Sequence, residues 1–301
     1  MKGRKLKLEG VYPALITPFT EDDRVDEEGL KTIIDYVTKG GVSGVVPCGT
    51  TGESATLSME EHKMVIKAVV EYSRVPVIAG TGSNNTKEAL ELTEFAGDVG
   101  ADAALVITPY YNKPNWRGLV EHYKKIAAVA KIPIILYNVP SRTGLNMTPD
   151  VVVELAEIPE IIGLKEASND LNQVMEIIER TEGKDFVVLS GNDILTLPMM
   201  ALGAKGVISV AANIVPKMMS TLTAEMLRGR VEHARKLHYE LLPLFRALFL
   251  ETNPIPVKAA AEMIGLIKNS RLRLPLAKIS WDNEDRVRNV LKELRLLKYL
   301  K

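Results

Sequence analysis

The chain has 301 residues, 46% of them hydrophobic, and carries 38 Lys and Arg against 38 Asp and Glu. This composition is typical of a globular protein, and a formal net charge of zero gives no overall attraction to nucleic acid or to an anionic membrane. The basic first ten residues lack the apolar stretch of a secretory signal, and no apolar run is long enough to span a bilayer. Because the single Cys48 allows no internal disulfide, as in a reducing compartment, we expect a cytoplasmic protein.

Short apolar runs alternate with amphipathic stretches over the first 230 residues. Strands are predicted at residues 11–19, 44–49, 75–80, 103–109, 132–139, 161–165, 186–190 and 206–210. Helices are predicted at residues 26–39, 59–72, 85–99, 116–130, 149–156, 171–180, 194–202 and 216–228. The second helix begins with a capping box, formed by Ser58 and Glu61. Eight βα units with buried strands predict a closed (β/α)8 TIM barrel, with a solenoid as the alternative.

After about Arg230 the strand pattern stops. Residues 231–250, 255–267 and 282–297 are predicted to be helices, separated by Pro254, Pro256 and the stretch 271–275. We therefore expect a catalytic barrel over residues 1–230 and a helical C-terminal extension over residues 231–301. No Gly/Ser linker separates them, so the extension is expected to pack on the barrel.

An apolar run at residues 161–164 leads directly into Lys165, at the predicted end of a buried strand. Burial disfavours a charged ammonium group and favours a neutral amine that can attack a carbonyl. Lys165 is therefore the candidate Schiff-base nucleophile. The alternative is a lysine that extends from the strand end into water or pairs with a carboxylate.

Other strand ends carry polar groups that belong at the same face of a barrel. Thr50 and Thr51, flanked by glycines, can direct hydroxyl and N–H groups at a small anion such as a carboxylate; the alternative is a tight βα turn. Tyr137 can transfer a proton, and Arg142 offers a forked donor for a carboxylate. Taken singly, these two are more typical of a half-buried tyrosine and a surface arginine.

Four segments resemble, in order and spacing, the dihydrodipicolinate synthase family of pyruvate-dependent class I aldolases, which is related to N-acetylneuraminate lyase. They are GTTGES at 49–54, PYYN at 109–112, YNVPSRTG at 137–144 and GLKEA at 163–167. The resemblance extends from about residue 10 to residue 253. It implies a TIM barrel whose lysine forms an imine with pyruvate, in the diaminopimelate route of lysine biosynthesis.

By this resemblance, Lys165 forms the imine, and the Thr50 and Thr51 region holds the pyruvate carboxylate. Tyr137 is the general acid and base, and Thr50 and Tyr111 complete its proton relay. Tyr111 reaches into the site of a neighbouring subunit, as the family norm of a homotetramer built from two tight dimers allows. The imine itself is the electron sink, so neither a metal nor an organic cofactor is implied.

The family resemblance also implies the second substrate. The pyruvate enamine adds to the aldehyde of L-aspartate 4-semialdehyde, and Arg142 binds the carboxylate of that substrate. Gly191 and Ile208 match positions that line the pyruvate pocket. Loops build the aldehyde pocket and change readily, so an aldolase for 2-keto-3-deoxy sugar acids, or one of the N-acetylneuraminate type, is the alternative. A barrel that binds a small acid without turning it over is the alternative from a different class.

A second site is implied more weakly. In many family members lysine binds at a subunit interface beside the active site. The matching positions are Ser54, Ala55, His62, Asn84, Glu88 and Tyr110. Met59 stands where lysine-sensitive members often carry a polar residue, so we expect weak or absent inhibition by lysine. The four histidines show no metal-ligand spacing, and no metal site is predicted.

Overall fold

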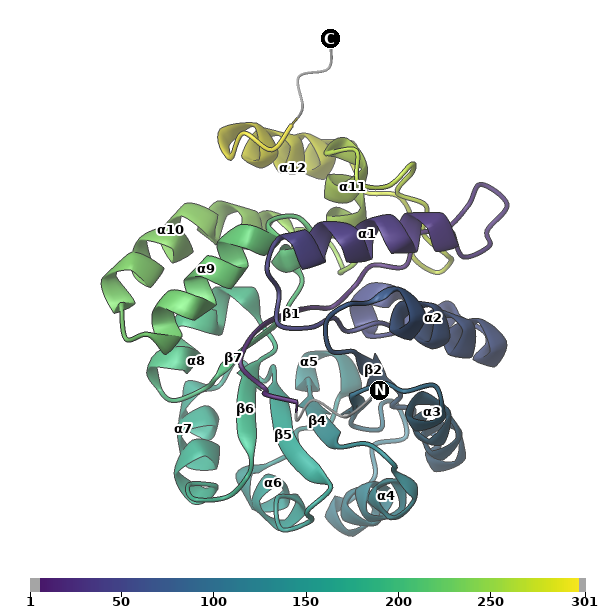
Figure 1. Ribbon diagram of the computed structural model, residues 1–301, viewed down its shortest axis with the longest axis vertical. Coiled ribbons are helices and arrows are strands. Elements are labelled where there is room, and N and C mark those ends of the chain that lie inside the picture. The colour runs from purple at the N-terminus through teal and green to yellow at the C-terminus, as the bar shows by residue number, and fades with distance from the viewer. Residues whose placement is uncertain (1–5, 298–301) are drawn as a thin grey trace.

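Seven parallel strands form a curved sheet at the centre of the computed structural model, which describes residues 6–297 (Figure 1). They are β1 (Gly10–Pro13), β2 (Ile78–Gly80), β3 (Ala103–Ile107), β4 (Ile134–Asn138), β5 (Ile161–Glu166), β6 (Val187–Ser190) and β7 (Gly206–Ser209). The strands pair in the order β1-β7-β6-β5-β4-β3-β2, so β1 and β2 are the two edges of the sheet.

The segment predicted as the second strand lies between these two edges and closes the sheet. Val46 bridges in parallel to Ala14, which follows β1, and Val45 bridges in parallel to Val77, which precedes β2. The segment contributes single bridges and no longer ladder, because Cys48 adopts a left-handed φ of 55° that ends the extended backbone. The predicted (β/α)8 barrel is confirmed, and the solenoid alternative is wrong.

Helices follow the strands around the outside of the barrel (Figure 1). They are α1 (Glu27–Lys39), α2 (Met59–Tyr72), α3 (Thr86–Asp98), α4 (Trp116–Val129), α6 (Pro149–Leu155), α7 (Leu171–Arg180), α8 (Thr196–Ala201) and α9 (Pro216–Leu227). The predicted capping box of α2 is confirmed: the Ser58 hydroxyl accepts from the Glu61 N–H at 3.2 Å, and the Glu61 carboxylate accepts from the Ser58 N–H at 2.9 Å. A four-residue helix, α5 (Pro140–Thr143), follows β4 and was not predicted.

Apolar side chains fill the inside of the barrel as well as the space between barrel and helices. The interior cluster includes Tyr12 on β1, Leu105 on β3, Ile135 on β4, Leu189 on β6 and Ile208 on β7. Alternate residues of each strand face this interior because successive side chains of a strand point to opposite sides. The barrel interior is therefore a packed core, and a substrate site is expected beyond the strand ends.

The C-terminal extension consists of α10 (Val231–Ala247), α11 (Ile255–Met263) and α12 (Trp281–Glu293). Figure 1 shows α11 and α12 at the end of the molecule that also carries α1. Leu241 of α10 and Val257 of α11 belong to the same buried cluster as Val11 of β1 and Ile33 of α1. The extension thus shares a hydrophobic core with the barrel, and a boundary near residue 230 stays a prediction.

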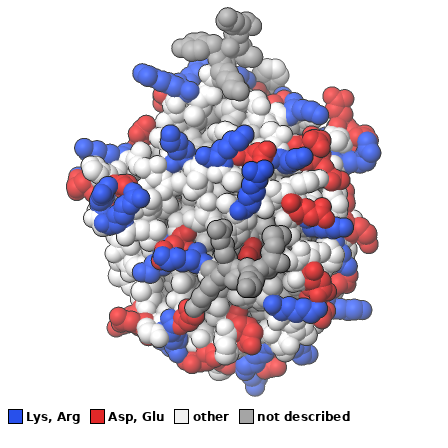
Figure 2. Space-filling model, viewed as in Figure 1, with Lys and Arg blue, Asp and Glu red and all other residues white. Residues whose placement is uncertain are grey.

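Charged side chains of both signs are interspersed over the face shown in Figure 2. Exposed ion pairs, such as Lys131 with Asp98 at 2.5 Å, join neighbouring elements. No large field of a single sign covers this face, which agrees with the balanced composition.

Candidate active site

The neighbouring strands β4 and β5 place Tyr137 directly opposite Lys165. Both side chains are buried, with 6% of Tyr137 and 5% of Lys165 exposed. The Lys165 Nζ lies 4.0 Å from the centroid of the Tyr137 ring. Within residues 6–297 no ion pair links Lys165 to a carboxylate, so neither alternative for this lysine, exposure to water or pairing, describes its surroundings. A buried amine beside a phenol is an arrangement suited to imine chemistry.

A buried carboxylate, Asp193, acts electrostatically on Lys165 and was not predicted from the sequence. Its Oδ2 accepts from the backbone N–H groups of Val210 at 3.0 Å and Ala211 at 2.9 Å. Burial raises the pKa of Asp193, and hydrogen bonds and the Lys165 charge oppose that rise. Asp193 and Lys165 therefore interact electrostatically, although no hydrogen bond or ion pair joins them within residues 6–297.

Glu166, the residue after Lys165, is held on the outside of the barrel by a buried polar network. Its carboxylate accepts from Asn138 Nδ2 at 3.0 Å, from Gln173 Nε2 at 3.2 Å and from the Ser168 N–H at 2.5 Å. Burial raises the pKa of Glu166, and these donors oppose that rise. The network fixes the end of β5, and with it the backbone that carries Lys165.

Gly191 and Ile208, predicted to line the pyruvate pocket, lie close to Lys165 and Tyr137 respectively. Gly191 follows β6, and its N–H donates to the carbonyl of Glu166 at 2.7 Å. A Cβ at this position would lie 3.2 Å from Lys165 Cγ and 2.7 Å from the Ala167 methyl, so only glycine leaves room for the lysine stem. Ile208 of β7 is 1% exposed and belongs to the interior cluster that includes Tyr137.

The threonine turn, residues 49–53, is a short 3-10 helix, η1 (Thr50–Gly52), ended by a left-handed Glu53. Thr51 is 2% exposed, and its Oγ1 accepts from Asn253 Nδ2 at 3.0 Å. The backbone carbonyl of the same Asn253 accepts from Arg142 Nη2 at 3.3 Å. Asn253 therefore links the threonine turn to Arg142 of α5, a role that was not predicted.

These side chains meet around one cavity of about 580 Å³. Thr50, Tyr137, Arg142 and Asn253 line it, and so does Cys48 at the base of the threonine turn. Of the residues predicted for the lysine site, Ser54, Ala55, His62, Glu88 and Tyr110 line the same cavity. One chain thus brings a proton donor, hydroxyl groups and a guanidinium group together beyond the strand ends, next to a buried lysine.

A model of the dihydrodipicolinate synthetase family matches residues 7–294. The chain belongs to this family. The 4-hydroxy-tetrahydrodipicolinate synthase of Methanosarcina mazei is 61% identical over 289 residues, which cover 96% of this chain and 99% of the relative. A crystal structure of dihydrodipicolinate synthase from Aquifex aeolicus is 49% identical, with a TM-score of 0.94 over 97% of this chain and 100% of that chain. The chloride-inhibited enzyme from Acinetobacter baumannii, complexed with pyruvate, is 44% identical, with a TM-score of 0.94 and the same coverage.

Six predicted residues of this dihydrodipicolinate synthase family member are not part of the cavity lining: Thr51, Asn84, Tyr111, Lys165, Gly191 and Ile208. Tyr111 is 87% exposed and adopts a left-handed φ of 70°, whereas its neighbour Tyr110 lines the cavity. Asn84 contributes its carbonyl, which accepts from Asn112 Nδ2 at 2.9 Å. A single chain therefore does not bring Tyr111 to Tyr137.

The predicted lysine site also includes His62 and Glu88. His62 is buried, and its Nε2 donates to the Gly80 carbonyl at 2.7 Å. Burial lowers the pKa of His62, while the Gly80 carbonyl opposes that shift. Glu88 accepts from the Ser83 hydroxyl at 2.7 Å. An imidazole from α2 and an anchored carboxylate from α3 thus line the same side of the chain's cavity.

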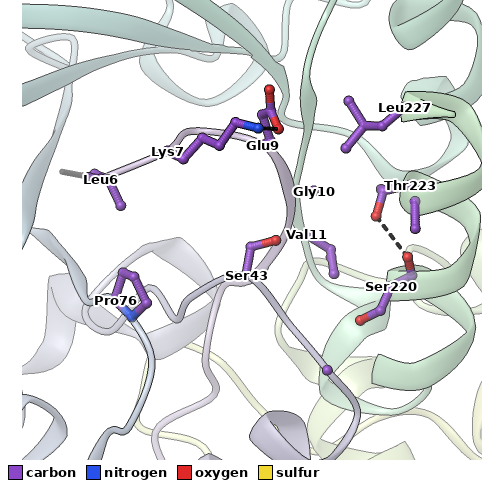
Figure 3. A pocket seen from close by; sticks show the side chains of 12 residues that line it. Leu6, Lys7, Glu9, Gly10, Val11, Ser43, Pro76, Ser220, Thr223 and Leu227 are labelled. Carbon is purple, nitrogen blue, oxygen red and sulfur yellow. Dashed lines mark hydrogen bonds and ion pairs between the residues drawn. The ribbon is translucent and has the colours of Figure 1, made fainter. Parts of the chain in front are cut away.

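A second cavity, of about 450 Å³, lies at the opposite, amino-terminal ends of the strands of this family member (Figure 3). Gly10, Ser43 and Pro76 line it beside α9. The Thr223 hydroxyl donates to the carbonyl of Ser220, as the dashed line in Figure 3 shows. None of the predicted site residues lines this cavity.

Over residues 6–297 no group of three His, Cys, Asp or Glu side chains is arranged to hold a metal ion. In the same part of the chain, none of the helices combines the length and apolar character needed to cross a membrane.

Proposed function

We propose that this chain is a 4-hydroxy-tetrahydrodipicolinate synthase that joins pyruvate, as an imine of Lys165, to L-aspartate 4-semialdehyde. The observation that carries the proposal is the buried Lys165 amine, 4.0 Å from the ring centre of Tyr137 beside a cavity. The synthase name of a relative that is 61% identical over nearly the whole chain supports the reaction. The pyruvate complex of the Acinetobacter baumannii relative supports the first substrate.

In the first step the Lys165 nitrogen attacks the keto carbon of pyruvate. A C–N bond forms, and the keto oxygen leaves as water with one proton from the nitrogen and one from the general acid, so that the iminium nitrogen keeps one proton. Tyr137 lies on the strand next to Lys165 and supplies and removes the protons of these steps. Loss of a methyl proton from the imine then gives the enamine, because the iminium nitrogen accepts the electron pair.

The threonine turn is assigned to the pyruvate carboxylate. Thr50 lines the cavity, and the Thr51 hydroxyl is oriented by its hydrogen bond with Asn253. Gly191 gives room beside the lysine stem, and Ile208 packs in the apolar cluster that includes Tyr137. These groups hold a small planar acid close to the amine, and holding reactants in place is a large part of catalysis.

Arg142 is assigned to the carboxylate of the semialdehyde. It lines the cavity, and its Nη2 donates to the carbonyl of Asn253, which leaves further guanidinium donors for a substrate. The Methanosarcina mazei relative is named a 4-hydroxy-tetrahydrodipicolinate synthase, and this favours the semialdehyde over 2-keto-3-deoxy sugar acids as the second substrate. Arg142→Ala should raise the KM for the semialdehyde by about tenfold or more, without preventing imine formation with pyruvate.

A borohydride trap tests the proposed mechanism. Wild-type protein treated with pyruvate and borohydride should gain one pyruvate-derived adduct, located on Lys165 by peptide mass. Lys165→Arg keeps the positive charge but should lose the adduct, whereas Lys131→Arg, at an exposed surface pair, should keep it. An adduct on another lysine would contradict the mechanism, and an adduct without turnover of the semialdehyde would favour the alternative aldolase.

The cavity that holds the candidate active site also holds most of the predicted lysine site. We infer weak or absent inhibition by lysine, because Met59 in the lining gives no polar partner for a charged ligand. Inhibition by micromolar lysine would contradict this inference, and titration of lysine against initial rates measures it directly.

We infer a cytoplasmic homotetramer in which Tyr111 completes the proton relay of a neighbouring chain. The exposed position of this tyrosine, 87% accessible in one chain, supports contact with a partner. Sedimentation at working concentrations gives the mass of the assembly. Tyr111→Phe should lower kcat without changing that mass, and a fully active monomer would refute the assignment.

A further inference from the structure

The last residue of the threonine turn, Glu53, has a backbone conformation that favours glycine. Its φ is 55° and its ψ is 36°, in the left-handed region. A residue with a Cβ is unfavourable there, so the side chain must supply something that glycine cannot. Glu53 is only 4% exposed, and its carboxylate lies inside the protein.

This carboxylate is bound from the C-terminal extension. The Oε1 of Glu53 accepts from Lys258 Nζ of α11 at 2.7 Å, and its Oε2 accepts from the backbone N–H of Arg273 at 3.1 Å. Lys258 is 0% exposed and also donates to the carbonyl of Thr17 at 2.9 Å. One ammonium group therefore joins two loops that follow neighbouring barrel strands to the extension.

The same contacts reach the groups assigned to the pyruvate carboxylate. The Glu53 N–H donates to the Thr50 carbonyl at 3.1 Å, and the Thr17 hydroxyl donates to the Gly52 carbonyl at 2.7 Å. Asn253, just before α11, donates to Thr51 Oγ1. The turn that carries Thr50 and Thr51 is thus held through Thr51, Gly52 and Glu53, and the extension provides the buried charge and the amide.

A purely stabilising role does not require an ion pair. Apolar side chains of similar volume in place of a buried ion pair often give equal or greater stability, because two charges no longer have to be removed from water. The ion pair instead fixes the orientation of Glu53, because a carboxylate accepts hydrogen bonds only along its lone pairs.

We propose that the Glu53–Lys258 ion pair is a positioning device that holds the threonine turn of the barrel in its carboxylate-binding geometry. The proposal rests on the proposed function, because it assumes that this turn binds pyruvate. Neither Glu53 nor Lys258 acts on the substrate; each acts through Thr50 and Thr51.

The test separates positioning from stability with three variants: Glu53→Leu, Lys258→Met and the double variant. Each single variant leaves one buried charge without its partner and should lower the melting temperature strongly. The double variant removes both charges and should recover most of the stability. If the pair positions the turn, the double variant still requires at least tenfold more pyruvate for half-maximal borohydride trapping, while its trapping at saturating pyruvate stays close to that of the wild type.

Two further measurements complete the test. Glu53→Gln keeps the volume and an acceptor oxygen, and should bind pyruvate more tightly than the double variant. The matched control replaces the exposed pair Lys131 and Asp98 together by Met and Leu. This control should change neither the melting temperature nor the pyruvate concentration for half-maximal trapping.

The outcomes distinguish this inference from the function on which it rests. If wild-type Lys165 is not trapped at all, the proposed function fails. If the wild type is trapped and the double variant shows wild-type dependence on pyruvate, the ion pair is a structural contact and the positioning proposal is refuted.

Discussion

Gly191→Ala tests how closely the lysine environment is packed. The new Cβ would lie 2.7 Å from the Ala167 methyl and 3.1 Å from the Glu166 carbonyl oxygen, whereas ordinary contacts begin at 3.4 Å. Neither neighbour can rotate away, and the Gly191 N–H is tied to the same carbonyl at 2.7 Å. Relief therefore requires a shift of the β5 backbone or of Lys165, whose Cγ would lie 3.2 Å from the new atom.

We expect Gly191→Ala to lower the free energy of unfolding by about 2 kcal/mol, as overpacking commonly does. A displacement of the amine by a fraction of an ångström should reduce kcat/KM by roughly 100-fold, because misplaced reacting groups lose much of their advantage. Urea unfolding measures the first quantity, and steady-state kinetics with borohydride trapping measures the second.

Gly118→Ala in α4 is the matched control. Its Cβ would meet Pro114 at 3.4 Å, an ordinary contact, and alanine favours a helix by about 1 kcal/mol over glycine. This control should leave both stability and kinetics unimpaired. If Gly191→Ala kept the kcat/KM of the wild type, the packing argument would be refuted. The extra methyl group would then fit beside the Lys165 side chain without displacing it.

Three further predictions follow from single contacts. Ser58→Ala removes the capping box of α2 and should cost about 1 kcal/mol of stability, measured by urea unfolding, without changing kcat. Tyr137→Phe removes the phenol next to Lys165 and should lower kcat by roughly 100-fold or more while the fold, followed by circular dichroism, is kept. Burial lowers the pKa of His122 to about 4, so the folded state binds its proton less readily than the unfolded state. The stability that neutral His122 contributes is present above the unfolded-state pKa of about 6.5 and is lost as the pH falls from there towards the folded-state pKa of about 4. Between pH 7 and pH 5 this loss amounts to about 2 kcal/mol. Urea unfolding of His122→Gln between pH 7 and pH 5 should show a shallower loss of stability than the wild type, and an equally steep loss would contradict this assignment.

The barrel and the lysine–tyrosine pair could be predicted because their signals are local. Buried strands and amphipathic helices repeat along the chain, and Lys165 stands directly behind an apolar run. Tyr137 was found in the same way, at the end of another strand. Parallel strands in a barrel bring their carboxyl ends together, so local sequence patterns predict that Lys165 and Tyr137 lie close in space.

Contacts between the extension and the barrel could not be predicted because they join residues about 200 positions apart. Asn253 had no predicted role, although it bonds to Thr51, 202 residues earlier. Lys258 lies in an apolar helical pattern, where nothing local indicates a carboxylate partner. The helix α5 has four residues, too few to show a period, and only the proline at its first position indicated a helix start.

The span of these contacts also bears on how the protein is made. Glu53 meets Lys258 and the backbone of Arg273 only after 205 and 220 further residues have been synthesised. A ribosome-bound chain can form the first βα units while the partners of its threonine turn do not yet exist, and pairing across such a separation is slow. Lys165 is therefore translated well before the threonine turn acquires its anchors, and the order of synthesis delays these contacts until the polypeptide is nearly finished.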